Sequence, residues 1–238
     1  MPIWLSVILC GLLGYMLGCI NPAYIIARIR GFDIRSRGSG NAGASNAVIT
    51  MGKAVGVFSA LFDIFKAWLA VCIAVRCFKG LSVGDTLVAG EIAGVACVLG
   101  HMFPVFLAFR GGKGLACMGG MILYMNWKAF LFLLGGELLL VLVTDYICVA
   151  PLSLSAVFPI IRGIQTGSWA PAVILCVVIP AIWYKHAVNI RRIADGTEVH
   201  FSYLWNKEGE TDRISKKEEG SPSDSDTEQQ NRDCDGNA

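Results

Sequence analysis

Hydrophobic and polar positions alternate along this chain in long blocks. Seven apolar segments lie at approximately 3–27, 53–77, 87–107, 114–126, 129–144, 146–162 and 169–185. A helix needs about 20 mostly apolar residues to cross the hydrocarbon core of a bilayer. The pattern therefore predicts an all-α integral membrane protein, a bundle of seven transmembrane helices. The fourth and fifth segments are short for full crossings, so six or eight crossings remain as alternatives.

The composition separates a membrane domain from a polar tail. Hydrophobic residues make up 55% of the 238 residues, above the 45–50% typical of soluble domains. Residues 1–205 are expected to form one transmembrane domain with a formal charge of +7. Residues 206–238 hold ten acidic and five basic side chains and few apolar ones, which predicts a disordered acidic cytoplasmic tail.

The loop charges predict the orientation. With seven spans, one side receives ten basic residues, Arg28, Arg30, Arg35, Arg37, Lys53, Arg110, Lys113, Lys185, Arg191 and Arg192. The other side receives four, Arg76, Lys79, Lys128 and Arg162. Cytoplasmic loops carry the excess of Lys and Arg. We therefore expect the N-terminus outside, the C-terminus inside, and the glycine-rich loops in the cytoplasm.

The first informative loop interleaves glycines with hydroxyl and amide side chains and follows two arginines. Its candidate binding residues are Gly38, Ser39, Gly40, Asn41, Gly43, Ser45 and Asn46. Such a sequence lets successive backbone N–H groups point into one concavity beside a helix start, where they can bind an anion. A flexible turn is the alternative for this loop taken alone.

The second loop combines two cations with three glycines. It consists of Arg110, Gly111, Gly112, Lys113 and Gly114 and follows the sequence Gly-His-Met-Phe-Pro. The spacing and the strand–helix context of a nucleotide-binding Walker loop are missing. An anion site is the better interpretation, because glycines permit close approach and Lys113 supplies a point charge.

The third candidate is a basic helix end. His186 and Asn189 are three residues apart, so they share one face of a helix, and Gly196, Thr197 and Glu198 follow. The pair could donate hydrogen bonds to a phosphate or a hydroxyl. Arg191 and Arg192 are expected to contact lipid headgroups rather than substrate.

Ionisable residues also occur inside the apolar segments. Asp63 and Lys66 are three apart in the second segment, and intramembrane charges commonly mark function. The alternative is a compensating pair that braces the loops. His101 precedes a Phe-Pro sequence, and either packing or catalysis would explain it.

The sequence lacks several common catalytic patterns. No Gly-x-Ser-x-Gly elbow, no metal-ligand spacing among cysteines and histidines, and no nucleophile–base pair is evident. No metal, cofactor, nucleic acid or obligatory protein partner is expected.

Three motifs, in this order between apolar segments, resemble one bacterial family. They are Gly-Ser-Gly-Asn-x-Gly-Ala-x-Asn, then Gly-His-x-Phe-Pro-x-Phe-Leu-x-Phe-Arg-Gly-Gly-Lys-Gly, then His-x-x-Asn-Ile-x-Arg with a following Gly-Thr-Glu. They look like the motifs of the acyl-phosphate:glycerol-3-phosphate acyltransferases, the PlsY family. The resemblance covers the chain from about Leu12 to Glu198.

The resemblance implies a multi-pass enzyme of the bacterial inner membrane. Such an enzyme transfers a long-chain acyl group from acyl phosphate to the 1-hydroxyl of sn-glycerol 3-phosphate, giving lysophosphatidic acid and inorganic phosphate. Its partners would be these two substrates and membrane lipid. The family's functional positions fall here on Ser39, Asn41, Ser45, Lys113, His186 and Asn189. Of these, we expect Ser39, Lys113, His186 and Asn189 to be catalytic, with Asp63, Lys66, His101 and Glu198 in support.

One departure bears on substrate affinity. This chain has Ile49 where the family usually has an arginine expected to hold glycerol 3-phosphate. Arg35, Arg37 or Arg110 would have to compensate. Two alternatives to the enzyme remain, a transporter or binding protein for an anionic solute or lipid phosphate, and a family member without catalytic activity.

Overall fold

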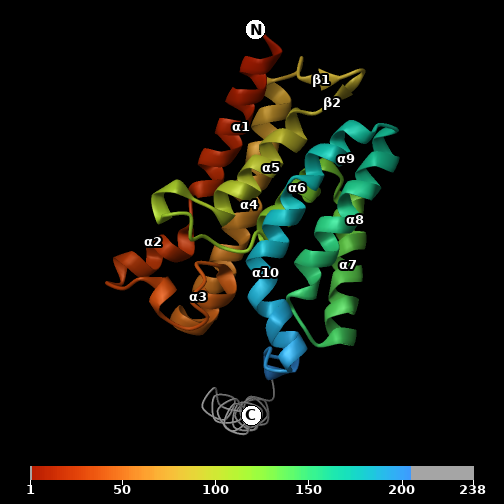
Figure 1. The fold of residues 1–238 in the computed structure, drawn as a ribbon. Helices are drawn as coiled ribbons and strands as arrows, with labels where there is room; N and C mark the ends of the chain where they lie inside the picture. The colour runs from red at the N-terminus through yellow and green to blue at the C-terminus, as the bar shows by residue number, and fades with distance from the viewer. Residues whose placement is uncertain (1, 205–238) are drawn as a thin grey trace, which may run out of the picture.

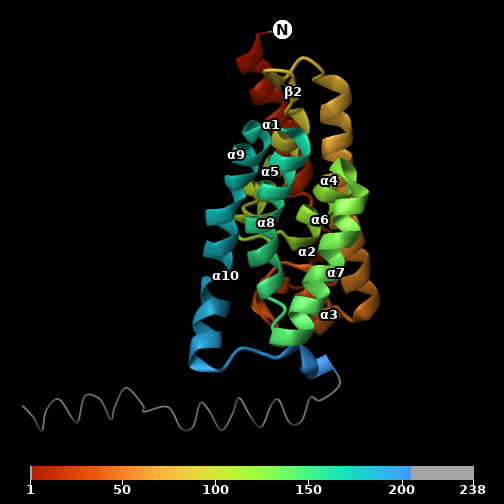
Figure 2. The same ribbon diagram turned by 90° about the vertical axis from the view of Figure 1, so that its right-hand side faces the viewer.

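A computed structural model describes residues 2–204 and shows an elongated bundle of α-helices (Figures 1 and 2). The helices are α1 Ile3–Cys19, α2 Pro22–Ile29, α3 Ala44–Met51, α4 Lys53–Cys77, α5 Ala89–Met102, α6 Leu115–Met125, α7 Trp127–Thr144, α8 Val149–Thr166, α9 Trp169–Cys176 and α10 Val178–Asp195. Short 3-10 turns cover Ile34–Ser36, Val105–Leu107 and Phe201–Leu204. The predicted tail, 206–238, lies outside the described residues.

A small antiparallel hairpin joins α4 to α5. Strand β1 is Ser82–Val83 and strand β2 is Thr86–Leu87, with Ser82 opposite Leu87. The hairpin lies beside the N-terminal end of α1 (Figure 1). It is a local exception to the all-α prediction and leaves the helical class unchanged.

Six helical segments among the described residues are long and apolar enough to cross a bilayer. They are Ile3–Ile29, Lys53–Cys77, Ala89–Leu107, Trp127–Thr144, Val149–Thr166 and Trp169–Asp195. The predicted fifth segment is the 18-residue helix α7, so its length suffices. The predicted fourth segment, α6, has only 11 residues, about 16 Å of helix. By length alone, the structure therefore has six candidate spans and one shorter apolar helix.

The first span is interrupted at Asn21 and Pro22. The Asn21 side chain accepts a hydrogen bond from the Tyr24 amide and caps α2. That amide would otherwise bond to the Ile20 carbonyl in a continuous helix. The Lys66 ammonium instead donates to the Ile20 carbonyl at 2.6 Å. An Asn-Pro pair is a helix-start signal, and here it redirects the chain towards the first glycine-rich loop.

Glycines allow the first and third spans to approach closely. A Cβ added at Gly14 would overlap the backbone of Ala93, and one at Gly18 would overlap that of Cys97. Helices α1 and α5 therefore meet backbone to backbone, as small residues permit in membrane bundles. Helix α5 is held in the middle of the bundle in this way, with its C-terminal end beside the candidate site.

The outer helices expose apolar side chains, as a lipid-facing surface requires. Phe132 and Val143 of α7 are 75% and 77% exposed. The core lies instead where α4, α5, α6, α8 and α10 meet, around Met118, Phe158 and Ile182. The first glycine-rich loop, beside α3, and the second half of α10 lie towards the end of the bundle away from the N-terminus (Figure 1).

Candidate active site

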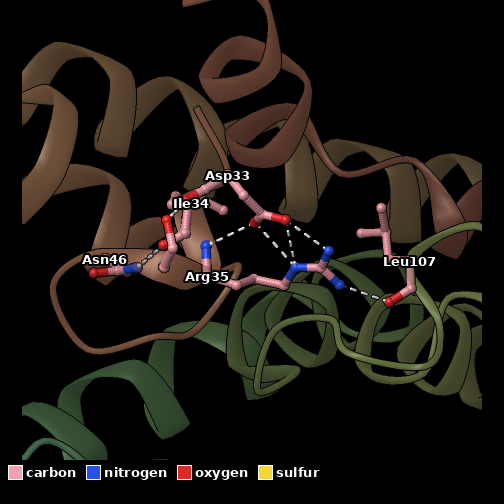
Figure 3. Close-up of polar contacts among 6 residues, drawn as sticks. Asp33, Ile34, Arg35, Asn46 and Leu107 are labelled. Carbon is pink, nitrogen blue, oxygen red and sulfur yellow. Dashed lines mark hydrogen bonds and ion pairs between the residues drawn. The ribbon is translucent and has the colours of Figure 1, made fainter. Parts of the chain in front are cut away.

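The Asn46 side chain organises the first glycine-rich loop. Its oxygen accepts from the Ser39 amide at 2.9 Å, and its nitrogen lies within 3.0 Å of the carbonyls of Ile34, Arg37 and Asn41. Figure 3 draws the bond to Ile34. Asn46 is fully buried, so its amide holds the loop together. This differs from the prediction that Asn46 contacts substrate, because its side chain is buried and bonded to backbone groups.

Replacing Asn46 with aspartate is expected to lower kcat/KM at least tenfold. The change puts a second oxygen against three carbonyl oxygens and removes the side-chain donor that they share, which is costly in a buried site. Activity and thermal unfolding of the purified protein would be measured together. Asn126→Asp is the matched control, because Asn126 uses only its oxygen, which accepts from the Ala129 amide. An equal effect in both variants would contradict the proposed role of Asn46.

Glycine is required at Gly38 for two reasons. Its φ is +58°, a left-handed conformation, and an added Cβ would collide with the Asn46 oxygen. The glycine at this position therefore allows the loop to fold closely around Asn46. Ser39, Gly40 and Ser45 are exposed on it, and Asn41 is half-buried.

Arg35 joins the first loop to the second. Its guanidinium donates to both carboxylate oxygens of Asp33 and, at 2.8 Å, to the Leu107 carbonyl (Figure 3). The bonds from Arg35 lower the pKa of Asp33 to about 2. Because Arg35 is engaged in this way, its task is to hold the two loops together rather than to bind substrate freely.

The second loop folds back onto the end of α5. The Gly111 amide donates to the Met102 carbonyl and the Gly112 amide to the His101 carbonyl, at 3.1 and 3.0 Å. An added Cβ at Gly112 would collide with the His101 ring, and one at Gly43 would lie 3.9 Å from the Gly112 Cα. The two loops thus touch through their glycines. Gly114 caps α6, and the Arg110 side chain is exposed.

Lys113 connects the second loop to α10. Its ammonium donates to the Asn189 oxygen at 2.6 Å, and the Asn189 nitrogen donates to Glu198 at 2.5 Å. Burial lowers the pKa of Lys113, and the nearby Glu198 carboxylate opposes that effect. The three predicted motifs therefore meet, the first and second at Gly43 and Gly112, and the second and third through Lys113 and Asn189.

His186 lies one helical turn before Asn189 and is 1% exposed. Its Nδ1 is 2.8 Å from the Ile182 carbonyl. A carbonyl only accepts, so Nδ1 carries a proton. In the neutral ring Nε2 is then an acceptor, and it becomes a donor only when the ring is protonated. The sequence had predicted a donor at this position.

A buried ionic cluster supports both loops from within the bundle. The Lys66 ammonium lies 2.7 Å from an Asp63 oxygen and 3.1 Å from His101 Nδ1, besides its bond to Ile20. Asp63, His101 and Cys117 have ligand-type atoms within 4.8 Å of one another, as a metal site would. The Lys66 ammonium already supplies the positive charge next to Asp63, so the residues do not fit a metal ion. The cluster braces the Ile20–Asn21 break and the loop behind His101.

A family model described as "Glycerol-3-phosphate acyltransferase" matches residues 8–196. The chain belongs to the glycerol-3-phosphate acyltransferase family. The predicted resemblance is thereby confirmed, over nearly the whole described part of the chain.

Curated relatives of this acyltransferase family come from diverse bacteria. The glycerol-3-phosphate acyltransferase of Clostridioides difficile is 38% identical over 195 residues, 81% of this chain and 94% of the relative. That of Brucella anthropi is 36% identical over 200 residues, covering 83% and 95%. Both relatives are matched almost from end to end.

Solved structures of an acyltransferase show the same fold. Crystal structures of PlsY (YgiH), an integral membrane glycerol 3-phosphate acyltransferase, match with TM-scores of 0.72 for its glycerol 3-phosphate form and 0.70 for its lysophosphatidic acid form. Both are 32% identical and cover 84% of this chain and 97% of theirs. This chain is thus an integral membrane protein with the fold of that enzyme.

Two residues that support the candidate site of this acyltransferase were not predicted from the sequence. Asn21 donates from its side chain to the Ala42 carbonyl at 2.7 Å while it caps α2. Asp145 holds the segment that carries Glu198. The Asn-Pro pair was a readable signal for the cap at Asn21, whereas no local pattern marks Asp145.

Proposed function

We propose that this chain transfers a long-chain acyl group from acyl phosphate to the 1-hydroxyl of glycerol 3-phosphate. The observation that carries the proposal is the contact of Lys113 with Asn189, which brings the glycine-rich loops and the His–Asn motif to one site. The relatives are glycerol-3-phosphate acyltransferases, which supports both the acceptor and the acyl transfer. A glycine-rich loop and a lysine suit a reaction between two phosphate-bearing molecules.

The proposed reaction needs little covalent help from the protein. The acceptor hydroxyl attacks the acyl carbonyl, the bond to the phosphate oxygen breaks, and the hydroxyl proton leaves with the released phosphate. Acyl phosphate is already activated, so holding the two substrates together supplies much of the acceleration. A substrate phosphate can take the proton, which agrees with the absence of a nucleophile–base pair from the sequence motifs.

The residues are assigned by their position in the site. Lys113 and loop amides would stabilise the carbonyl oxyanion and the leaving phosphate. Ser39, Asn41 and Ser45 present polar groups on the first loop, and His186 and Asn189 complete the site from α10. Glu198 orients Asn189, while Asn46, Arg35 and the Asp63–Lys66–His101 cluster hold the loops. The exposed Arg110 side chain is not assigned to holding the loops, so it suits contact with a phosphate or a lipid headgroup.

For the topology, we propose seven crossings, with the short α6 as the fourth, in the bacterial inner membrane. The N-terminus would lie outside and the C-terminus inside. Support comes from the ten basic residues on the side of the loops against four on the other. A glycine-rich site on the cytoplasmic side would meet soluble glycerol 3-phosphate, and the acyl chain would lie between apolar helices.

A phosphate-release assay tests the proposal. Purified protein in detergent, given acyl phosphate and glycerol 3-phosphate, should release inorganic phosphate and form lysophosphatidic acid without any gradient. Omitting glycerol 3-phosphate controls for hydrolysis. A transporter, or a family member without activity, would give no product, and that result would refute the proposal.

Ile49→Arg is expected to lower the KM for glycerol 3-phosphate. Ile49 is 65% exposed on α3, and its Cγ2 lies 3.3 Å from where a Cβ on Gly38 would be. An arginine there would reach the first loop and add a cation for the substrate phosphate. Steady-state kinetics at varied glycerol 3-phosphate would measure the change, with Ile49→Met as the uncharged long-chain control. An unchanged or raised KM would contradict a phosphate role at this position.

A further inference from the structure

The loop between α7 and α8 binds the segment that follows α10. Asp145 caps the C-terminal end of α7; its φ is +61° and its amide donates to the Val141 carbonyl. The chain after α10 crosses towards the base of α7 (Figure 2). The two regions meet at a group that we call the Asp145 cluster: Asp145, Tyr146, His200 and Ser202.

Asp145 accepts hydrogen bonds with its main-chain and side-chain oxygens. The Phe201 amide donates to its carbonyl at 2.6 Å. The Ser202 amide and hydroxyl donate to its two carboxylate oxygens, each at 2.8 Å. His200 adds contacts with the carboxylate at 3.6 Å and with the Tyr146 hydroxyl at 3.2 Å. One residue thus fixes three successive residues of the other segment.

Glu198 lies between two anchored points of this segment. On one side, the Thr197 and Glu198 amides donate to the Arg192 carbonyl at the end of α10. On the other side, the Asp145 cluster holds 200–202. Between them the Glu198 side chain is buried and accepts from Asn189, which in turn accepts from Lys113. The position of the segment therefore sets how Asn189 and Lys113 are held.

A second observation links the loop between α7 and α8 to Glu198 and Lys113. Burial raises the pKa of Cys148, as does the nearby Glu198 carboxylate, while Lys113 lowers it. Cys148 is the residue from which α8 starts, three residues after Asp145. The charges of Glu198 and Lys113 therefore act on the loop 145–148, which also binds the segment behind them.

We propose that Asp145 is a positioning residue for acyl transfer, which acts through Glu198 and Asn189 to hold Lys113 in its productive orientation. The inference rests on the proposed function. Asp145 does not touch the reacting groups in this assignment. A role in folding alone would instead stabilise the bundle without any dependence on Glu198.

Asp145→Gly removes the side chain and keeps the backbone, because glycine adopts the left-handed conformation freely. We expect kcat to fall at least tenfold, with KM for both substrates changed less than threefold. Asp145→Asn retains the shape and an acceptor and tolerates the same φ, so it should keep at least a third of the wild-type kcat. Val199→Ala, on the exposed face of the same segment, is the control and should behave as wild type.

The decisive measurement repeats Asp145→Gly in a Glu198→Gln background. Residues that act through one another are not additive, so the further fall there should be less than threefold. An undiminished tenfold fall, or a normal kcat in the single variant, would overturn the proposal. If Asp145→Gly does not purify as folded protein, Ser202→Ala replaces it, because this variant removes one hydrogen bond of the Asp145 cluster. Ser202→Ala should lower kcat at least threefold in the wild-type background and less in the Glu198→Gln background.

A readout that needs no turnover separates this proposal from the proposed function. Amide hydrogen exchange in detergent should increase in Asp145→Gly at residues 110–114, which Asp145 does not contact, as well as at 196–202. Unchanged exchange at 110–114 would overturn the positioning role. Wild-type protein without acyl transfer would refute the proposed function, while the exchange result would still decide whether Asp145 controls the second loop.

Discussion

Lys113→Ala is expected to lower kcat about a hundredfold or more. A single donor to a developing oxyanion is worth about 3 kcal/mol when it is preorganised in a site that excludes water. Lys113 is preorganised by its 2.6 Å bond to Asn189 and is partly buried. Phosphate release by purified protein, at saturating concentrations of both substrates, measures the effect.

Two controls define the result for Lys113. Lys128→Ala removes a cation in the first turn of α7, over the Trp127 ring, and should leave kcat within twofold of wild type. Lys113→Arg keeps the charge but changes the donor geometry, so it should recover part of the loss. Near-normal turnover of Lys113→Ala would remove Lys113 from the catalytic assignment.

Lys66→Met is expected to destabilise the protein by about 3–5 kcal/mol, the usual consequence of removing one partner of a buried ion pair. Lys66 and Asp63 are at most 4% exposed and 2.7 Å apart. Without the ammonium, His101 is the one partner left to the Asp63 carboxylate among residues 2–204, and the Ile20 carbonyl loses its Lys66 donor. Denaturant or thermal unfolding in a fixed detergent measures the change.

A double variant tests the cause of that instability. Asp63→Asn combined with Lys66→Met removes the buried charge as well as its partner and should recover at least half of the lost stability. Lys79→Met, at an exposed lysine after α4, should change stability by no more than about 0.5 kcal/mol. Equal losses in the single and double variants would show that packing around Lys66, and not the charge of Asp63, matters.

The apolar blocks were sufficient for the helical class but not for the helix count. Composition predicts that a segment lies in the bilayer, because transfer free energy depends on side-chain type. It does not predict where α6 begins and ends, since its 11 residues are limited by the loop at Gly114 and by the Asn126 cap. The break at Asn21 was hidden inside one apolar segment for a similar reason, although the Asn-Pro pair signalled it.

Within the site, residue type and spacing predicted the location of the site better than the task of each residue. The glycine-rich loops, Lys113 and the His186–Asn189 pair were found from spacing alone, and the structure joins them. Asn46 was predicted to bind substrate, yet its amide is used by four backbone groups of its own loop. Whether Asn46 binds substrate or its own loop depends on where the backbone groups of the loop point. The identity and spacing of the residues do not give that direction.

By itself, the sequence determined that this chain is a helical membrane protein with the motifs of an acyltransferase family, in glycine-rich loops that are predicted to bind anions. Those properties depend on local composition and order, which can be read directly. Only the tertiary structure decided which groups meet. Lys113 pairs with Asn189 across 76 positions, Arg35 with Leu107 across 72, and Lys66 with Ile20 across 46. The physical reason is that a helix such as α1, apolar on all sides, has no preferred face in its sequence, so its rotation and partners follow from packing.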